Sequence, residues 1–186
     1  MTTPTTTTTT TMGHACFFYG TLMSFKVLSR VLYGTPTPEA WQSQGLHIRP
    51  AILHDYCRHQ VRFADYPGIV AEPGKCVRGT YVTGITDMEL WRLDAFEGGE
   101  YRREVVRVRL LRGEGEEGME EMGERECATY VYKDENRLVK EEWDFAEFVR
   151  EKLHRWVGDE KEYSGQSTSG SDSGDEEEDG DEDGDE

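Results

Sequence analysis

The chain has 186 residues, the size of one domain, with a formal net charge of −17 and 35% hydrophobic residues. No concentrated basic face is evident, so we expect no DNA or RNA binding. No run approaches the roughly 20 apolar residues that span a bilayer, so we expect no membrane association.

Both ends of the chain have unusual compositions. Residues 1–13 are almost all threonine, and residues 164–186 hold eleven acidic residues and no large apolar side chain. Such segments bury too little apolar surface to offset the entropy of ordering. We therefore predict a disordered Thr-rich arm over residues 1–13, a folded domain over 14–160 and a disordered acidic tail over 161–186. Removing the eleven acids takes the net charge from −17 to −6, so the domain itself is only mildly acidic.

The domain begins with a strand, a turn and a helix. Residues 14–20 are rich in aromatic groups and end at a glycine, which is typical of a buried strand that enters a turn. Ser24 is a candidate cap for a helix that ends at Gly34, and the apolar residues between them recur at helical spacing.

Short apolar runs fill residues 44–84, and turn signals at Tyr66-Pro67-Gly68 and Pro73-Gly74 divide them into predicted strands. A second helix is predicted to follow. Thr86 and Glu89 have the spacing of a capping box, and Gly98-Gly99 marks the end of the helix.

The last third of the domain predicts a hairpin and a closing helix. Residues 101–111 and 126–133 carry alternating β-formers, and the Gly- and Glu-rich residues 112–125 between them predict a long mobile loop. From Trp143 to Trp156 the apolar residues recur at the spacing of an amphipathic helix.

No metal or thiol site is expected. The four cysteines are widely separated and form no C-x-x-C pair, which favours reduced thiols in the core. His54 and His59 lie near Cys57, but five residues apart on a strand they point to opposite faces, which argues against joint ligation. We expect no cofactor.

The first candidate for function is Tyr19-Gly20-Thr21-Leu22, where the strand gives way to a helix. A glycine at such a turn lets backbone N–H groups face a bound anion, and the helix N-terminus adds positive potential. On spacing alone, an ordinary turn explains the glycine equally well.

The second candidate is Glu97, at the end of the second helix. Its helical phase places it on the apolar stripe of Leu90 and Leu93. Burial and the helix dipole there both raise the pKa of a carboxyl group toward that of a general base. Glu100 is the rival candidate and Asp94 the third.

Four blocks of sequence resemble one known family. They are Phe17 to Leu22, Tyr66-Pro67-Gly68-Ile69-Val70, Val77-Arg78-Gly79, and Leu93 to Val106 with Glu97-Gly98-Gly99 at its centre. In this order and spacing they look like the AIG2-like branch of the γ-glutamylcyclotransferase-like family, over about residues 15–157. Tyr101 and Arg103 also match the pattern, although strand packing or a surface ion pair explains them as well.

The resemblance implies an α+β fold, with a small mixed β-barrel-like core flanked by helices. It also implies an enzyme that releases 5-oxoproline from a γ-glutamyl compound by an acyl-transferring cyclisation. The positions that match the family's substrate loop are Tyr19, Gly20, Thr21 and Leu22, and Glu97 matches its acid/base glutamate.

Two functions remain open at this point. One is the γ-glutamylcyclotransferase, acting on a small γ-glutamyl substrate. The other is a non-catalytic member that binds a metabolite or a protein, with the acidic tail in contact with basic proteins. Because the Thr-rich start lacks the basic and apolar regions of a secretory signal, we expect a cytoplasmic protein.

Overall fold

The computed structural model describes residues 13–113 and 119–158. The predicted acidic tail, and the predicted Thr-rich arm apart from Gly13, lie outside the described residues, so the domain limits of 14–160 stay a prediction. Within the described part of the chain, no helix is long and apolar enough to cross a membrane.

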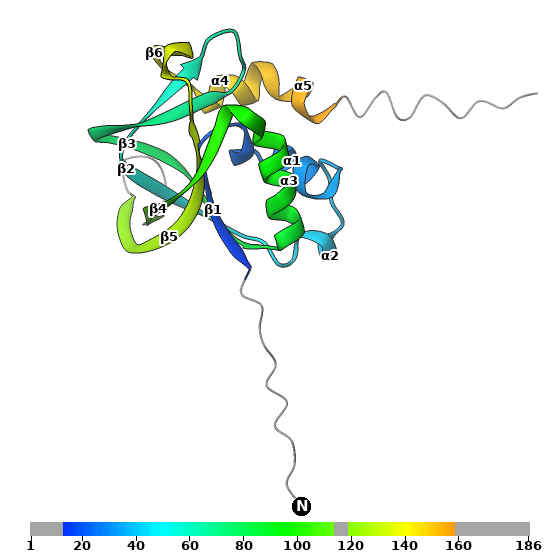
Figure 1. Cartoon of the computed structure of the whole chain (residues 1–186). Coiled ribbons are helices and arrows are strands. Elements are labelled where there is room, and N and C mark those ends of the chain that lie inside the picture. The colour runs from blue at the N-terminus through cyan, green and yellow to red at the C-terminus, as the bar shows by residue number, and fades with distance from the viewer. Residues whose placement is uncertain (1–12, 114–118, 159–186) are drawn as a thin grey trace, which may run out of the picture.

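Strands close into a small barrel that forms the centre of the molecule (Figure 1). Their order in the sheet is β3-β1-β5-β4-β2-β6, and a further pairing of β2 with β3 closes the ring. All pairs are antiparallel except β1 with β5. The strands are β1 His14–Phe18, β2 His47–Val61, β3 Pro67–Ile85, β4 Tyr101–Arg112, β5 Glu120–Tyr132 and β6 Leu138–Glu142. This architecture confirms the predicted barrel-like core with flanking helices.

Helices α1 and α3 lie side by side against one side of the barrel, and the C-terminal helical segment lies near them (Figure 1). The α-helices are α1 Phe25–Tyr33, α2 Ala40–Ser43, α3 Asp87–Glu97, α4 Phe145–Glu147 and α5 Leu153–Val157. One π-helical turn, η4 Phe148–Lys152, joins α4 to α5. The 3₁₀ turns are η1 Thr21–Met23, η2 Gly98–Glu100 and η3 Glu135–Arg137.

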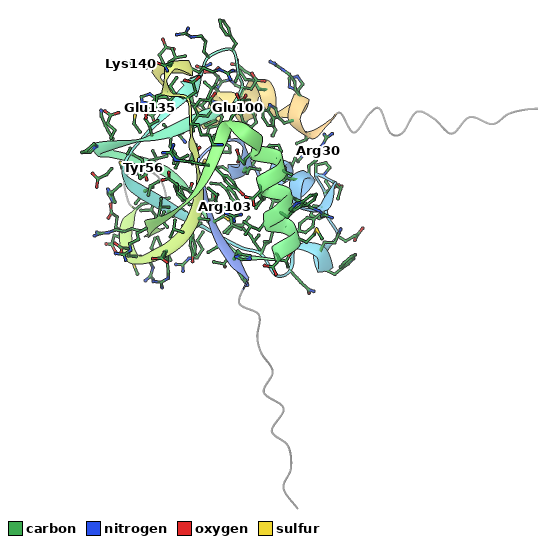
Figure 2. All side chains as sticks on the ribbon, viewed as in Figure 1. Arg30, Tyr56, Glu100, Arg103, Glu135 and Lys140 are labelled. Atoms are coloured by element: carbon green, nitrogen blue, oxygen red, sulfur yellow. The ribbon has the colours of Figure 1, made fainter. Side chains whose placement is uncertain are left out.

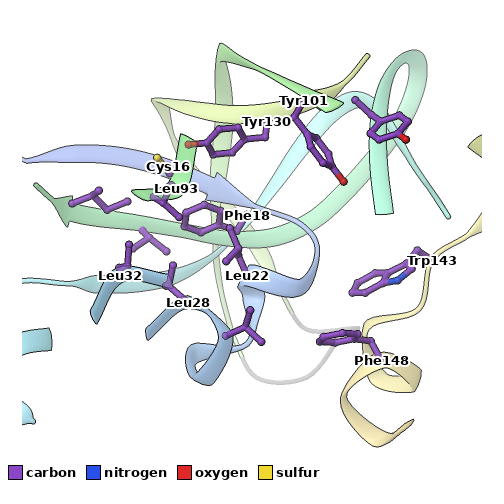
Figure 3. Packing of buried hydrophobic residues seen from close by; sticks show 14 of the residues in the cluster. Cys16, Phe18, Leu22, Leu28, Leu32, Leu93, Tyr101, Tyr130, Trp143 and Phe148 are labelled. Carbon is purple, nitrogen blue, oxygen red and sulfur yellow. The ribbon is translucent and has the colours of Figure 1, made fainter. Parts of the chain in front are cut away.

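Strand β1 has two buried faces, because successive side chains of a strand point in opposite directions. Phe17 and Tyr19 belong to one apolar cluster, together with side chains from β2 to β5. Cys16 and Phe18 belong to a second cluster, which the helices share. Figure 3 shows this second cluster, with Leu28 and Leu32 of α1 packed below Phe18. Burial on both faces explains why β1 is a continuous apolar run.

The predicted limits of the first two helices, α1 and α3, are confirmed. In α3 the Thr86 side chain accepts a hydrogen bond from the Glu89 N–H, and the Glu89 carboxylate accepts one from the Thr86 N–H. Helix α1 ends at Gly34, whose φ of 79° lies in the left-handed region that favours glycine. Ser24 occupies the N-cap position of α1, but its side chain makes no capping hydrogen bond.

Three sequence predictions need correction. Pro73-Gly74 does not separate two strands: β3 continues through it as a bulge, where the Gly74 N–H donates to the Asp55 carboxylate at 2.9 Å. Residues 120–125 belong to β5 and not to the predicted loop, while residues 114–118 lie outside the described part. The closing helix begins at Phe145, since Asp144 caps it, and Trp143 precedes it.

Candidate functional site

A pocket of about 190 Å³ lies where β1 ends, β3 begins and α3 ends. The five leading candidates from the sequence line it: the loop Tyr19, Gly20, Thr21 and Leu22, and the acid Glu97. The other lining residues are Phe18, Tyr66, Pro67, Phe96, Glu100, Tyr101 and Trp156. Segments that are far apart in the sequence therefore meet in one small cavity.

The loop after β1 is held in place from three sides. The buried Tyr19 hydroxyl donates to the Tyr130 carbonyl at 2.5 Å, and the Arg58 guanidinium donates to the Tyr19 carbonyl at 3.0 Å. A Cβ at Gly20 would lie 2.8 Å from the ring of Pro67. The φ of Gly20 is −126°, so glycine is needed here for close approach and not for a left-handed turn.

The Tyr19 hydroxyl is bonded inside the protein, so it is not the group of the loop that meets a ligand. Thr21 and Leu22 form the first turn of η1, where backbone N–H groups have no partner within the helix. Such N–H groups bind carboxylates or polarise carbonyl oxygens.

Glu97 is the last residue of α3, and it lies on the predicted apolar stripe. Leu93 is fully buried, Leu90 packs against the same cluster, and Glu97 is itself half-buried. Burial raises the pKa of the Glu97 carboxyl from 4.5 to about 8. Within the described residues, no side chain or backbone group pairs with this carboxyl by a hydrogen bond or an ion pair.

Glu100, the rival candidate, also lines the pocket but is engaged by three neighbours. Hydrogen bonds from the Tyr66 hydroxyl at 2.7 Å and from the Arg137 guanidinium lower its pKa, and Tyr132 donates a further, longer bond. Glu100 is therefore held as an ionised structural acceptor, near the end of α3 (Figure 2).

Asp94, the third candidate, does not line the pocket. Both of its oxygens accept from Arg103 of β4, at 2.7 and 2.6 Å, and the Tyr130 hydroxyl donates to it at 2.8 Å. Figure 2 shows that Arg103 lies beside α3, below Glu100. Asp94 and Arg103 therefore join α3 to the barrel.

Two aromatic residues complete the pocket: Trp156, which was not a candidate in the sequence, and Tyr101, which matched the family pattern without an assigned role. Trp156 of α5 contacts Phe96 and Tyr66 edge-on, with ring centroids 6.1 and 6.2 Å apart, so one side of the pocket is aromatic. Tyr101 lines the pocket and donates to the Pro67 carbonyl at 2.8 Å, so it also anchors the start of β3. The helical spacing of the apolar residues predicted only that Trp156 packs against the domain. Its position in the pocket depends on how the whole chain folds.

His54 and His59 have different partners. His54 pairs with Glu121 at 2.9 Å, whereas His59 faces Glu72 at 3.8 Å. Neither histidine lines the pocket.

Comparison with known proteins places most of the chain in one family. The family model described as "Gamma-glutamyl cyclotransferase, AIG2-like" matches residues 16–145. Two relatives come from Arabidopsis thaliana. "Protein AIG2 C" is 32% identical over 135 residues, which is 73% of this chain and 72% of the relative. "AIG2-like protein D" is 32% identical over 153 residues, or 81% of this chain and 89% of the relative.

A solved structure supports the same fold. The solution structure of an Arabidopsis thaliana protein has a TM-score of 0.55 to this chain and 28% sequence identity. The likeness covers 88% of this chain and 96% of the solved one. The matched regions include the barrel, both helices beside it and the residues that line the pocket up to Tyr101.

Proposed function

Because the chain belongs to the AIG2-like γ-glutamyl cyclotransferase family, we propose that it releases 5-oxoproline from a γ-glutamyl compound, with Glu97 as the general acid/base. The observation that carries this proposal is the state of Glu97. It is the one candidate carboxyl that lines the pocket, lacks a hydrogen-bond partner among the described residues and has a pKa near neutrality.

The size of the cavity suits the γ-glutamyl end of a substrate. At about 190 Å³ it is smaller than the roughly 300–1,000 Å³ of most small-molecule sites, so it takes a small head group. The backbone N–H groups of Thr21 and Leu22 bind the α-carboxylate or polarise the γ-carbonyl. The leaving group then extends past the aromatic side of Phe96 and Trp156.

The chemistry requires no covalent bond to the protein. Ionised Glu97 takes a proton from the α-ammonium group of the substrate. The free amine then attacks the γ-carbonyl carbon of the same molecule, which closes a five-membered ring. A new C–N bond closes the 5-oxoproline ring as the γ-amide C–N bond breaks. Glu97 returns its proton to the nitrogen of the leaving amine and ends the cycle ionised, as it began. The attacking nitrogen releases its second proton as the ring closes, and the leaving amine takes up this proton as well and departs as an ammonium ion.

Holding the substrate folded supplies much of the rate. Attack within one molecule avoids the entropy of bringing two reactants together, provided that the amine lies about 3–3.5 Å from the carbonyl carbon. A rigid loop fixed by Tyr130, Arg58 and Pro67 meets this requirement better than a mobile one.

The test is a screen of the purified full-length chain for 5-oxoproline release. The panel contains γ-glutamyl dipeptides, glutathione, γ-glutamyl amines and ε-(γ-glutamyl)lysine, and the matching α-glutamyl dipeptides are the control. We expect turnover of at least one γ-linked compound and none of the α-linked compounds. No turnover across the γ-linked panel would overturn the proposal and favour a binding protein.

A further inference from the structure

A second group of reactive side chains lies on β2 and β3. Cys57, His59 and Glu72 each offer one ligand atom, and these three atoms all lie within 4.8 Å of one another. The cluster shares no residue with the pocket of Glu97. All three residues are partly buried, and only 17% of the His59 side chain is exposed.

The strand pairing explains how the three side chains meet. Cys57 and His59 are two residues apart on β2, so they point to the same face of the sheet. Cys57 pairs with Val70 of β3, and Glu72 lies two residues beyond Val70 on that face. The bulge of β3 begins after Ala71, so the regular hydrogen-bond pairing between β2 and β3 is interrupted at Glu72.

Arg58, between the two ligand candidates, projects from the other face. Its guanidinium lies 5.5 Å from the centre of the Trp143 ring and donates to the Tyr19 carbonyl. The cluster therefore lies across the strand from the arginine that braces the substrate loop.

The imidazole of His59 has few competing partners. Its Nε2 lies 3.8 Å from a Glu72 oxygen, which is beyond a good hydrogen bond. Its Nδ1 is buried and has no hydrogen-bond partner in the described part of the chain. Nε2 is the ring nitrogen on the side of Glu72, so it is the one that can bind an ion there.

We propose that Cys57, His59 and Glu72 form a binding site for one zinc ion. A thiolate, a neutral imidazole and a carboxylate are the three kinds of protein ligand that zinc takes, and together they carry the charge of −2 that balances Zn²⁺. Ligand atoms of a tetrahedral zinc site lie about 3.5 Å apart, so side-chain rotations that close the cluster by about 1 Å suffice. A water molecule completes the fourth position. Calcium and magnesium are excluded because they bind oxygen ligands.

The test is metal titration of the full-length chain, reduced and stripped with EDTA. Zn²⁺ is added in competition with a chromophoric chelator, and Co²⁺ is then used as a spectroscopic probe. We expect one tight equivalent of Zn²⁺, a thiolate-to-cobalt charge-transfer band and a higher melting temperature with zinc. If the acidic tail also binds Co²⁺ weakly, it contributes no thiolate-to-cobalt band, because it contains no cysteine.

Variants assign the site. Cys57→Ser and Glu72→Gln should each weaken zinc binding at least tenfold, roughly the loss seen when a metal site loses a supporting group, and Cys57→Ser should abolish the cobalt band. Cys76→Ser, an exposed cysteine outside the cluster, is the matched control and should bind as the wild type does. Equal affinity of wild type and Cys57→Ser, or cobalt binding without a thiolate band, would overturn the proposal. Glu72→Gln decides the matter if Cys57→Ser does not fold.

Discussion

Asp94, Glu97 and Glu100 follow one another at three-residue intervals, and their neighbours give them different chemistry. Arg103 and Tyr130 bind Asp94, and Tyr66, Tyr132 and Arg137 bind Glu100. Glu97 has only burial, which holds its proton until near pH 8. The sequence could place Glu97 on the apolar stripe because helical phase is local. The sequence could not show that Glu100 has hydrogen-bond partners and Glu97 has none, because the partners of Glu100 come from distant segments of the chain.

The first prediction at this scale concerns the pH dependence of turnover. Below its pKa Glu97 is protonated and cannot accept a proton, so kcat/KM should fall on the acidic side with an apparent pKa of about 8. In the enzyme–substrate complex, the α-ammonium group of the substrate favours the ionised form of Glu97 and so lowers its pKa. The acidic limb of the kcat profile should therefore lie at lower pH than that of kcat/KM. Rate profiles over pH 4–10 supply the measurement. An acidic limb near 4.5 in kcat/KM would contradict the account.

The second prediction concerns stability. The folded protein holds the Glu97 proton until about pH 8, whereas the unfolded chain releases it near 4.5. Glu97 therefore contributes to the free energy of unfolding below pH 4.5, and this contribution is lost as the pH rises to about 8. At about 1.4 kcal/mol per pKa unit, the loss amounts to a few kcal/mol. Glu97→Gln should melt close to wild type at pH 4.5 and several degrees higher at pH 8. A difference that does not change with pH would be inconsistent with a raised pKa.

At the scale of elements, α3 is the helix that carries Glu97, and its ends are set by its own residues. Thr86 and Glu89 satisfy the first N–H groups, and Gly98 with a φ of 62° ends the helix. These local signals could be predicted from the sequence. The bulge at Pro73-Gly74 could not, because it depends on Asp55 of the neighbouring strand, 19 residues away.

Loss of the α3 cap should separate stability from activity. Thr86→Ala removes the side chain that accepts from the Glu89 N–H, and the loss of such a cap costs about 0.5–2 kcal/mol. Urea unfolding provides the measurement, and Thr37→Ala on the surface is the control, expected within about 0.5 kcal/mol of wild type. Because Glu97 lies at the other end of α3, kcat/KM should change little. Unchanged stability in Thr86→Ala would show that the cap contributes nothing.

At the scale of the whole molecule, the closed barrel, the end of α3 and Trp156 of α5 form the walls of the pocket. Strand β1 is buried on both faces, so it fixes the position of the loop that follows it. The resemblance to the family implied this barrel. The closing pair β2 with β3 and the return of Trp156 to the pocket depend on contacts across the whole chain, which no local pattern encodes.

The terminal segments should be dispensable for folding. Neither residues 1–13 nor residues 161–186 contain enough apolar side chains to add to a core. A chain of residues 14–160 should therefore keep its melting temperature within a few degrees of the full-length protein. Calorimetry of the two proteins is the measurement, and a broad, non-cooperative transition in the shorter chain would show that the domain limits are misplaced.

The most direct test of the central claim is the kcat/KM of Glu97→Gln on the best γ-glutamyl substrate of the wild type. The substitution preserves the volume of the side chain and removes its ability to carry a proton. We predict a fall of about 10²–10⁴, the usual effect of losing a general acid/base, in a protein that remains folded. Glu100→Gln, measured in the same assay, should lose far less. Near wild-type turnover by Glu97→Gln, or a larger loss in Glu100→Gln, would contradict the assignment of Glu97.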